Sequence, residues 1–268
     1  MSVPIMQEHA SMGMIIHILA EERHRVIRDL LATEGQVLAT DLALRFGVSD
    51  DTVRRDLRDL ARAGACRRVY GGAVAAAPDR GPVRLRAKIA PEIKARLAAV
   101  AVRLIEPDQL VYIDAGSTNI AIASAIPPGL RVTVATNAIG VAAALADHPA
   151  VRLIVLGGAF DAATGACLGA ETLRAIDRLG ADLVFLGACA LDVSAGVTAF
   201  DAGDAEVKRA MVARSRAVAV AATADKLGTA ASYRVAPAPA ITHLVTEADQ
   251  PEAALAAFAA CGIAIHPA

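Results

Sequence analysis

Residues 49–64 have the sequence SDDTVRRDLRDLARAG, which predicts a capped amphipathic helix. Ser49 is a suitable N-cap residue, and Asp50 and Asp51 place negative charge in the first turn, where the helix dipole favours it. Apolar residues then recur at i, i+4 and i+7 and form one narrow stripe, made of Val53, Leu57 and Leu60. Gly64 suits the C′ position, so the helix is expected to end just before it.

The outer face of this helix carries a hydroxyl group and several guanidinium groups, from Thr52, Arg54, Arg55, Arg58 and Arg62. Between residues 52 and 75, six arginines accompany only Asp56 and Asp59, a local excess of four positive charges in a chain whose net charge is −1. Phosphate binding depends on this local field and not on the total charge. The stretch therefore predicts contact with an anionic partner.

The composition of the 268-residue chain indicates a folded protein with room for two ordinary domains. Its hydrophobic fraction of 55% is too high for an intrinsically disordered chain. The cysteines and histidines are scattered without metal-ligand spacing, which argues against a metal site and is typical of free thiols in a reducing cytosol. No apolar run is long enough to cross a membrane, so we expect a cytoplasmic protein. Residues 1–20 lack a basic start and a cleavage site and are interpreted as an extension with no assigned role.

The segments on either side of the arginine-bearing helix complete a DNA-binding fold. A first helix is predicted over residues 21–33, and a short second helix over residues 41–46, which Thr40 is expected to cap. Gly47 then makes a tight turn into the third helix. Helix, short helix, glycine-containing turn and helix is the helix-turn-helix arrangement, whose last helix enters the major groove of DNA. Residues 65–74 predict a β-hairpin, which would make the domain a winged helix.

The same region contains an ordered set of motifs. They are Ile27 and Leu30 in the first helix, Leu42-Ala43 and Phe46-Gly47-Val48-Ser49 through the turn, Thr52-Val53-Arg54-Arg55-Asp56-Leu57 in the third helix, and Arg68-Val69-Tyr70-Gly71-Gly72-Ala73 in the hairpin. On these motifs, residues 23–74 resemble the DNA-binding domain of the DeoR family of bacterial transcriptional regulators. Tyr70 departs from the family, which usually has histidine there. A tyrosine hydroxyl can still donate to a phosphate, so DNA binding should be retained.

We expect this domain to bind double-stranded operator DNA through its recognition helix, its turn and its wing. The expected contacts come from Thr40, Ser49, Thr52, Arg54, Arg55, Arg58, Arg68 and Tyr70. Ser49 and Thr52 are also ordinary helix-start residues, so phosphate contact competes there with simple capping. Arg62 is interpreted as part of a solvated surface, and Asp56 as the partner of a neighbouring arginine.

The remainder of the chain predicts a second domain. Small residues with proline and glycine over residues 76–82 indicate a linker, and residues 83–268 begin with a helix over residues 88–105. Buried strands are predicted from apolar runs at residues 110–113, 132–135, 153–156, 183–186, 218–221 and 241–245, with short strands near residues 196–198 and 263–265 extending the sheet. Alanine-rich helices alternate with these runs. The predicted fold is thus a small α+β winged helix-turn-helix domain followed by an α/β domain with a mainly parallel sheet.

Polar or glycine-rich clusters follow several of these strands, where ligands of parallel sheets bind. The first cluster, Asp114-Ala-Gly116-Ser117-Thr118, precedes a helix whose free N–H groups and dipole suit a phosphate. We expect one shared pocket formed by Asp114, Gly116, Ser117, Thr118, Thr136, Asn137, Gly157, Gly158, Asp192, Thr198, Lys208 and Lys226. Plain structural interpretations stay open: the Gly-Ser-Thr turn as a helix cap, the glycine pair as a conformational need, and Lys208 as a surface lysine.

From residue 83 onward the chain resembles the effector domain of the same family, whose fold is similar to ribose-5-phosphate isomerase and CoA-transferase proteins. The resemblance implies a pocket for a phosphorylated sugar or related metabolite. It assigns hydroxyl groups of the effector to Asp114, Asn137 and Asp192, and assigns the phosphate to Ser117, Thr118 and Lys226. The family commonly has Asp-x-Ser-Lys where this chain has Thr-Ala-Asp-Lys at residues 223–226, so the lysine is kept and its companion acid is displaced.

Three functions follow from these predictions. The first is a homo-oligomeric repressor of a carbohydrate or polyol operon, released from DNA by a phosphorylated sugar and needing no cofactor. The second is a sugar-phosphate isomerase fused to a DNA-binding domain, which requires a positioned carboxylate base. Asp114, Glu171 and Asp192 are the candidates for that base, and no glutamate is placed as in the isomerase. The third is a two-domain scaffold with an inactive pocket.

Overall fold

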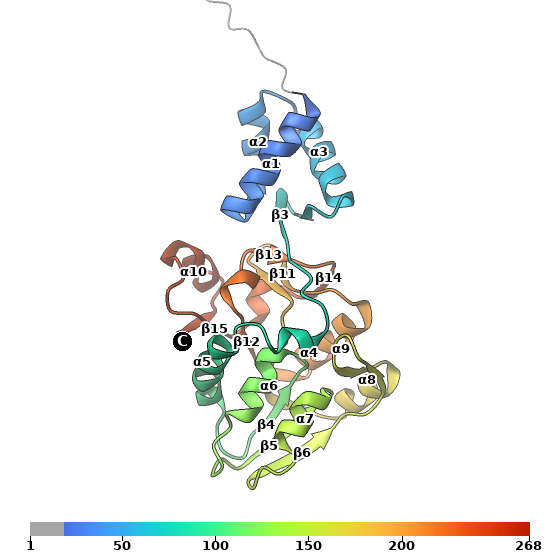
Figure 1. Cartoon of the computed structure of the whole chain (residues 1–268), viewed down its shortest axis with the longest axis vertical. Helices are drawn as coiled ribbons and strands as arrows, with labels where there is room; N and C mark the ends of the chain where they lie inside the picture. The colour runs from blue at the N-terminus through green and yellow to red at the C-terminus, as the bar shows by residue number, and fades with distance from the viewer. Residues whose placement is uncertain (1–18) are drawn as a thin grey trace, which may run out of the picture.

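The computed structural model describes residues 19–268, which form a small helical head and a larger α/β body. Figure 1 shows the head at one end of the molecule, joined to the body through strand β3 (Gly72–Ala76). The fold class predicted from the sequence is confirmed. The predicted extension over residues 1–20 lies outside the described part except for its last two residues, of which Ala20 begins α1 (Ala20–Glu34).

The head contains α1, α2 (Ala39–Phe46) and α3 (Asp50–Arg62) around one apolar core. The stripe predicted for α3 is fully buried there, against Ile27 of α1 and Phe46 of α2. Gly47 and Gly64 have φ values of 62° and 76°, in the left-handed region that glycine adopts without strain. The turn before α3 and the end of α3 are therefore both set by glycine, as predicted.

The wing is a hairpin of β2 (Cys66–Val69) and β3, to which two further strands are added. β1 (Gln36–Leu38) pairs antiparallel with β3 on its other edge, and β13 (Thr229–Ala230) of the body extends β3 in parallel register. A Cβ atom on Gly72 would lie 1.9 Å from the carbonyl oxygen of Val37, so only glycine allows β1 to approach this closely. Neither added strand was predicted from the sequence.

The body is built on a parallel sheet whose strand order, within residues 19–268, is β16-β15-β12-β9-β4-β5-β6. All pairs in it are parallel. The strands are β4 (Leu110–Ile113), β5 (Val132–Thr136), β6 (Val151–Val155), β9 (Ala181–Phe185), β12 (Ser215–Ala221), β15 (His243–Thr246) and β16 (Ala264–Pro267). Each overlaps a strand predicted from the sequence, including the partly exposed edge strands β6 and β16.

Helices cover both faces of this sheet, and each face has its own apolar core. The helices on one face are α5 (Pro91–Ala101), α6 (Ser117–Ser124) and α7 (Ile139–Leu145). The helices on the other face are α8 (Ala170–Asp177), α9 (Ala202–Ala213) and α10 (Glu252–Ala259). The short helix α4 (Val83–Arg86) and the 3-10 turns η1 (Val102–Leu104), η2 (Ala224–Lys226) and η3 (Ala238–Ala240) join these elements. Among residues 19–268, no helix is both long and apolar enough to cross a membrane.

Two small antiparallel sheets lie beside the main sheet. One consists of β10 (Ala190–Asp192), β11 (Gly196–Ala199) and β14 (Tyr233–Ala236), and the other of β7 (Ala159–Asp161) and β8 (Ala166–Leu168). The strand predicted near residues 196–198 exists as β11, but it belongs to the first of these sheets and does not extend the main one. The strand predicted near residues 263–265 does extend the main sheet, as β16.

The helix predicted over residues 88–105 is shorter than expected. α5 begins only at Pro91 and gives way to η1 at Val102. Ala90 precedes it with a φ of 46°, which breaks the helical path, and the proline at the first helical position fixes where the new helix starts. The residues before it form a separate element, made of α4 and its turn.

Candidate functional site

The start of α3 is held by its own side chains. Ser49 Oγ accepts a hydrogen bond from the backbone N–H of Thr52 at 3.3 Å and lies 3.0 Å from Thr52 Oγ1. Ser49 is therefore the N-cap that the sequence predicted. The expectation that Thr40 caps α2 is wrong, because the N-cap is Leu38 and Thr40 lies inside the helix, bonded to Asp41 at 3.3 Å. Thr40 remains exposed on the head.

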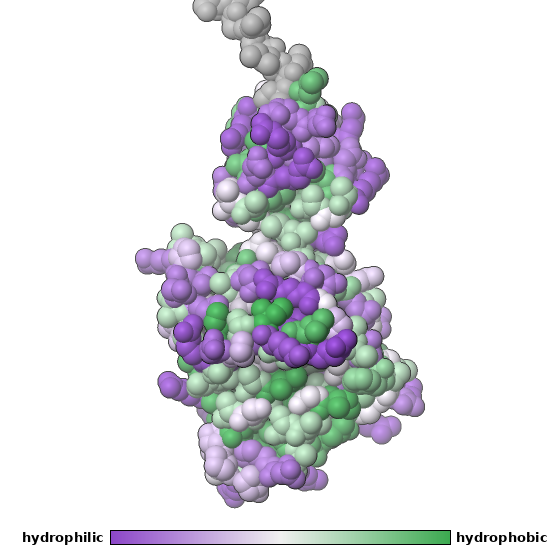
Figure 2. Space-filling model, in the orientation of Figure 1, coloured by the Kyte–Doolittle hydropathy of each residue, from purple (hydrophilic) through white to green (hydrophobic). Residues whose placement is uncertain are grey.

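The predicted arginines stand on the solvent side of α3. Arg54 is 3.8 Å from Asp50, and Arg58 donates to the carbonyl oxygen of Arg54 at 3.3 Å. Arg55 is exposed and has no partner among residues 19–268. Arg62 pairs with Asp59 at 3.4 Å at the far end of the helix. Figure 2 shows how hydrophilic side chains gather over the helices of the head.

The wing places further polar side chains beside this helix. Tyr70 is fully exposed at the tip of the hairpin, and Arg68 is exposed on β2. A groove between α3 and the wing is lined by Ala39, Arg54, Leu57, Arg68, Tyr70, Gly71 and Gly72. Arg67 points the other way and donates to Ser232 of the body at 3.1 Å. The groove thus joins predicted contact residues from two separate elements.

Asp56 is buried on the inner side of α3 and meets α1. Its carboxylate accepts two hydrogen bonds from the guanidinium of Arg23, at 2.7 and 3.0 Å, and lies 3.1 Å from His24 Nε2. The bond to Asp56 raises the pKa of Arg23. The partner of Asp56 is thus an arginine, as predicted, but it belongs to α1 and is not a neighbour in the sequence. The ion pair joins the recognition helix to the first helix.

Replacing Arg55 by alanine is expected to weaken DNA binding about tenfold without unfolding the head, because Arg55 is exposed and its side chain makes no hydrogen bond or ion pair within residues 19–268. A titration at several salt concentrations measures this, and the slope of log K against log salt should fall by about 1 for a lost phosphate contact. Arg62→Ala on the same helix is the control and should bind as the wild type does. Equal binding by both variants would remove Arg55 from the interface.

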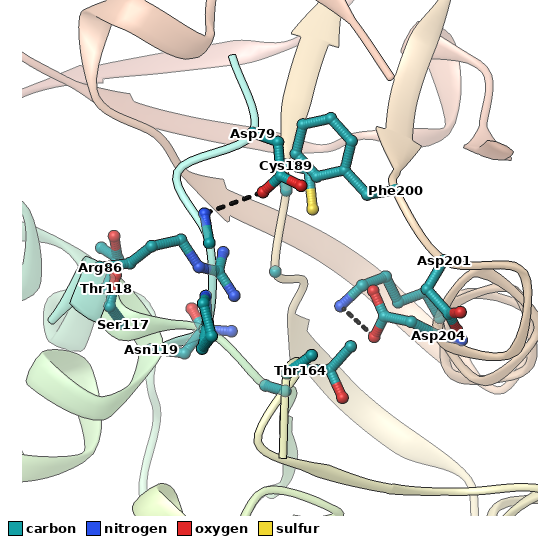
Figure 3. Close-up of a pocket in the computed structure, with 18 of the residues that line it drawn as sticks. Asp79, Arg86, Ser117, Thr118, Asn119, Thr164, Cys189, Phe200, Asp201 and Asp204 are labelled. Atoms are coloured by element: carbon teal, nitrogen blue, oxygen red, sulfur yellow. Dashed lines mark hydrogen bonds and ion pairs between the residues drawn. The ribbon is translucent and has the colours of Figure 1, made fainter. Parts of the chain in front are cut away.

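The body contains a cavity of about 310 Å³ beyond the carboxyl ends of β4, β9 and β12 (Figure 3). Of the predicted effector residues, it brings together Gly116, Ser117, Thr118, Lys208 and Lys226. The volume and the position at strand ends are those of a small-molecule site in a parallel α/β sheet.

One side of the cavity is the N-terminus of α6. Ser117 and Thr118 stand in its first turn, and Thr118 Oγ1 is buried without a hydrogen-bond partner among residues 19–268. Asn119, which was not singled out in the sequence, fixes this turn by donating to the carbonyl oxygens of Asp114 and Phe185, both at 2.9 Å. The free N–H groups of a helix start and an unused hydroxyl suit an anion.

The opposite side contains buried charges around Lys208. Its ammonium lies 2.5 Å from Asp114 Oδ2 and 3.2 Å from Asp204 Oδ1, and only 2% of its side chain is exposed. Burial alone would lower the pKa of Lys208, but the two carboxylates outweigh burial and raise it. Burial raises the pKa of Asp204. Lys208 is therefore not a surface lysine, and Asp114 lies behind the cavity wall, bonded to Lys208 and to the N–H of Gly187 at 2.8 Å.

Lys226 enters the cavity from η2. Its ammonium donates to the carbonyl oxygen of Ala188 at 2.9 Å, and burial lowers its pKa to about 8. A lysine in this state gains from an approaching anion, because the anion favours the charged form. Lys226 therefore remains a candidate phosphate ligand.

The other predicted effector residues do not line this cavity. Thr136 donates to Ile113 at 2.6 Å, and Asn137 donates to Cys167 at 3.1 Å. Gly157 accepts from Thr172, while a Cβ atom on Gly158 would meet that threonine at 2.2 Å. Asp192 accepts the N–H groups of Ser194 and Ala195 in the β10–β11 turn, and Thr198 accepts from Ala231 at 2.8 Å. The side chains of Thr136, Asn137, Asp192 and Thr198 thus form hydrogen bonds with backbone groups, and the two glycines lie against Thr172.

Several lining residues had no place in the predicted pocket. They come from α4 and the segment before it, from the β7–β8 hairpin, from the β9–β10 loop and from the start of α9, and comprise Asp79, Gly81, Pro82, Arg86, Asp161, Thr164, Cys189, Phe200 and Asp201. Asp201 is the N-cap of α9 and accepts from the N–H of Asp204 at 2.8 Å, so an acidic residue shortly before an alanine-rich helix was the signal that could have found it. Among the described residues, no group of His, Cys, Asp or Glu side chains could hold a metal ion.

A helix-turn-helix head with a basic outer face and an α/β body with a cavity define a ligand-responsive DNA-binding protein. A DeoR-like helix-turn-helix domain matches residues 23–78, and a DeoR C terminal sensor domain matches residues 89–248. The chain belongs to the DeoR family of transcriptional regulators.

Curated relatives match over most of their length. The HTH-type transcriptional regulator YgbI of Escherichia coli K12 is 30% identical over 87% of this chain and 92% of its own. The glycerol-3-phosphate regulon repressor of the same organism is 29% identical over 86% of this chain and 92% of its own. IolR of Bacillus subtilis is 27% identical over 84% and 90%. Among solved structures, ribose 5-phosphate isomerase A of Neisseria gonorrhoeae is 15% identical, with a TM-score of 0.38 over 50% of this chain and 52% of its own.

Proposed function

We propose that this regulator represses a carbohydrate or polyol operon in the cytoplasm and that a phosphorylated sugar bound in the body cavity releases it from DNA. The observation that carries the proposal is the polarity of the cavity. Figure 3 shows Arg86, Ser117 and Thr118 on one side, and Asp201 and Asp204 on the other. A phosphorylated polyol has one anionic end and a row of hydroxyl groups, which matches donors on one side and carboxylate acceptors on the other.

The relatives support the same assignment. One is named for the glycerol-3-phosphate regulon, and that compound is a phosphorylated polyol. None of the three carboxylates that the sequence offered as the isomerase base stands free in this cavity. Asp114 is occupied by Lys208, Asp192 accepts from its own turn, and Glu171 is exposed on α8 and does not line the cavity. The family is one of DNA-binding regulators, so we do not propose an enzyme.

The active form is expected to be a homo-oligomer. One chain carries one recognition helix, and helix-turn-helix proteins read paired half-sites about 34–36 Å apart with the two helices of a dimer. A dimer or a tetramer of this chain would present such a pair.

A thermal-shift screen of the full chain against phosphorylated sugars and polyols tests the proposed effector class. At least one compound should raise the melting temperature, while its unphosphorylated form should not, because the anion-binding side of the cavity would then be unused. A screen in which no phosphorylated compound stabilises the protein would contradict the proposal.

The affinity for the compound found in this screen should fall about tenfold between about pH 7 and pH 9, because Lys226 has a pKa of about 8 and loses its charge in this range. A phosphate ester keeps its charge there, since its second pKa is about 6. Isothermal titration across this range measures the effect. Lys226→Arg stays charged and should bind without the pH dependence, whereas a wild-type affinity that is flat with pH would exclude contact with Lys226.

A further inference from the structure

The wall of the cavity includes the segment that joins the two domains. We call residues 77–86, which run from the end of β3 through α4, the strap. Asp79, Gly81, Pro82 and Arg86 of the strap all line the cavity. The strap is anchored by a hydrogen bond from the N–H of Val83 to the carbonyl oxygen of Ala163 at 3.0 Å. The chain therefore passes directly from the wing to the ligand site.

Arg86 is the one strap residue with a cationic side chain in the cavity lining. Its guanidinium Nε is buried and has no hydrogen-bond partner among residues 19–268. Figure 3 shows the guanidinium extended into the cavity beside Ser117, Thr118 and Asn119. The backbone of Arg86 is held from behind, since the buried ammonium of Lys94 donates to the carbonyl oxygens of Arg86 and, at 2.6 Å, of Ile89. A fixed arginine with an unused donor suits an anionic group of a ligand.

Lys226 reaches the same cavity from a second segment that also touches the wing. We call residues 224–230, which contain η2 and β13, the arm. Thr229 donates to the carbonyl oxygen of Lys226 at 2.9 Å, and the next residue of the arm, Ala230, accepts from the N–H of Ala77 at 3.0 Å. β13 pairs with β3 of the wing in parallel register. Lys226 therefore lies three residues before β13, and Arg86 is joined to the end of β3 by the rest of the strap.

The strap and the arm also contact each other directly. Arg80 of the strap pairs with Asp225 of the arm at 3.0 Å. An apolar cluster of Val74, Ala195 and Ala230 packs where β3 meets the body. Without a ligand, the like charges of Arg86 and Lys226 work against this closed arrangement. An anion between them would turn this repulsion into two attractions, so it would bind best when the strap and the arm are close.

We propose that Arg86 binds the anionic group of the effector together with Lys226, so that the ligand bridges the strap and the arm and acts on the wing through β3 and β13. This inference rests on the proposed function, because it concerns the same cavity. Such a bridge gives the ligand a different affinity for two positions of the wing, which any effector needs if it is to change DNA binding.

Arg86→Gln tests the role of the guanidinium, with Arg84→Gln as a matched control that lies exposed on the same short helix and outside the cavity lining. The probes are inorganic phosphate and glycerol 3-phosphate, titrated into the full chain. Arg86→Gln should weaken binding of both at least about tenfold, as expected for a lost charge-assisted hydrogen bond, and Arg84→Gln should bind as the wild type does. Arg86→Lys should bind with intermediate affinity.

Hydrogen exchange of the same proteins tests the bridge. Saturating glycerol 3-phosphate should slow amide exchange in the strap, including the N–H of Ala77 that bonds to the arm, in the wild type and in Arg84→Gln but not in Arg86→Gln. If neither probe binds the wild type, the proposed function fails together with this inference. If Arg86→Gln binds both probes as tightly as the wild type, while Lys226→Ala binds them weakly, only the role of Arg86 is overturned. Ligand binding that leaves exchange in the wild-type strap unchanged would overturn the bridge.

Discussion

Replacing Asp56 by alanine is expected to lower the free energy of unfolding of the head by about 3–5 kcal/mol. Asp56 is 4% exposed and is the shared partner of Arg23 and His24, so its removal leaves the buried guanidinium without that carboxylate. Removing the carboxylate of a buried ion pair costs far more than the net gain of the intact pair. Because the pair joins α1 to α3, loss of stability here also frees the recognition helix from its support.

Chemical denaturation followed by circular dichroism measures this effect. Asp59→Ala is the matched control, because Asp59 lies three residues further along α3 and makes an exposed pair with Arg62 at 3.4 Å. Its removal should change the free energy of unfolding by less than about 1 kcal/mol. Equal denaturation midpoints for the two variants would show that the buried pair does not stabilise the head.

Replacing Lys208 by methionine is expected to lower the free energy of unfolding of the body by about 3–5 kcal/mol at neutral pH. Methionine fills much of the same space, but it leaves Asp114 and Asp204 buried beside each other without their shared cation. Two carboxylates in that position repel, and one of them must take up a proton. Lowering the pH toward the ordinary carboxylate range should therefore recover part of the lost stability relative to the wild type.

Lys88→Met is the control for this experiment, because Lys88 is exposed in the turn after α4. A surface substitution of this kind should change stability by no more than about 0.5 kcal/mol. If Lys208→Met were as stable as Lys88→Met across the pH range, the three buried charges would not form the unit described above.

The DNA-binding head was largely predictable because its signals are local. Ser49 caps α3 within three residues, and Gly47 and Gly64 set a turn and a helix end by their own backbone angles. In the wing sheet, the hairpin of β2 and β3 was predicted, but β1 and β13 were not. β1 is three residues long, and β13 comes from more than 150 residues further along the chain, so no local pattern marks either as a partner of β3.

The cavity was less predictable because strands that follow one another in the chain do not all border it. β4, β5 and β6 run outward to one edge of the sheet, whereas the cavity lies over β4, β9 and β12. The clusters after β5 and β6 were therefore assigned to a pocket that their strands do not reach. Arg86 was missed because it lies in a segment interpreted as the start of a domain, and only the fold brings that segment over the strand ends.

The central claim is that a phosphorylated ligand in the body cavity changes the affinity of α3 and the wing for DNA. The direct measurement is fluorescence anisotropy of a labelled duplex, selected by the full chain from a randomised pool, with and without the best compound of the thermal-shift screen. We expect the ligand to raise the apparent Kd of the wild type by about 5- to 150-fold, the usual range of allosteric coupling. Lys226→Ala should bind the duplex as the wild type does without ligand and should fail to respond. A ligand that stabilises the wild type but leaves its Kd for DNA unchanged would contradict the account.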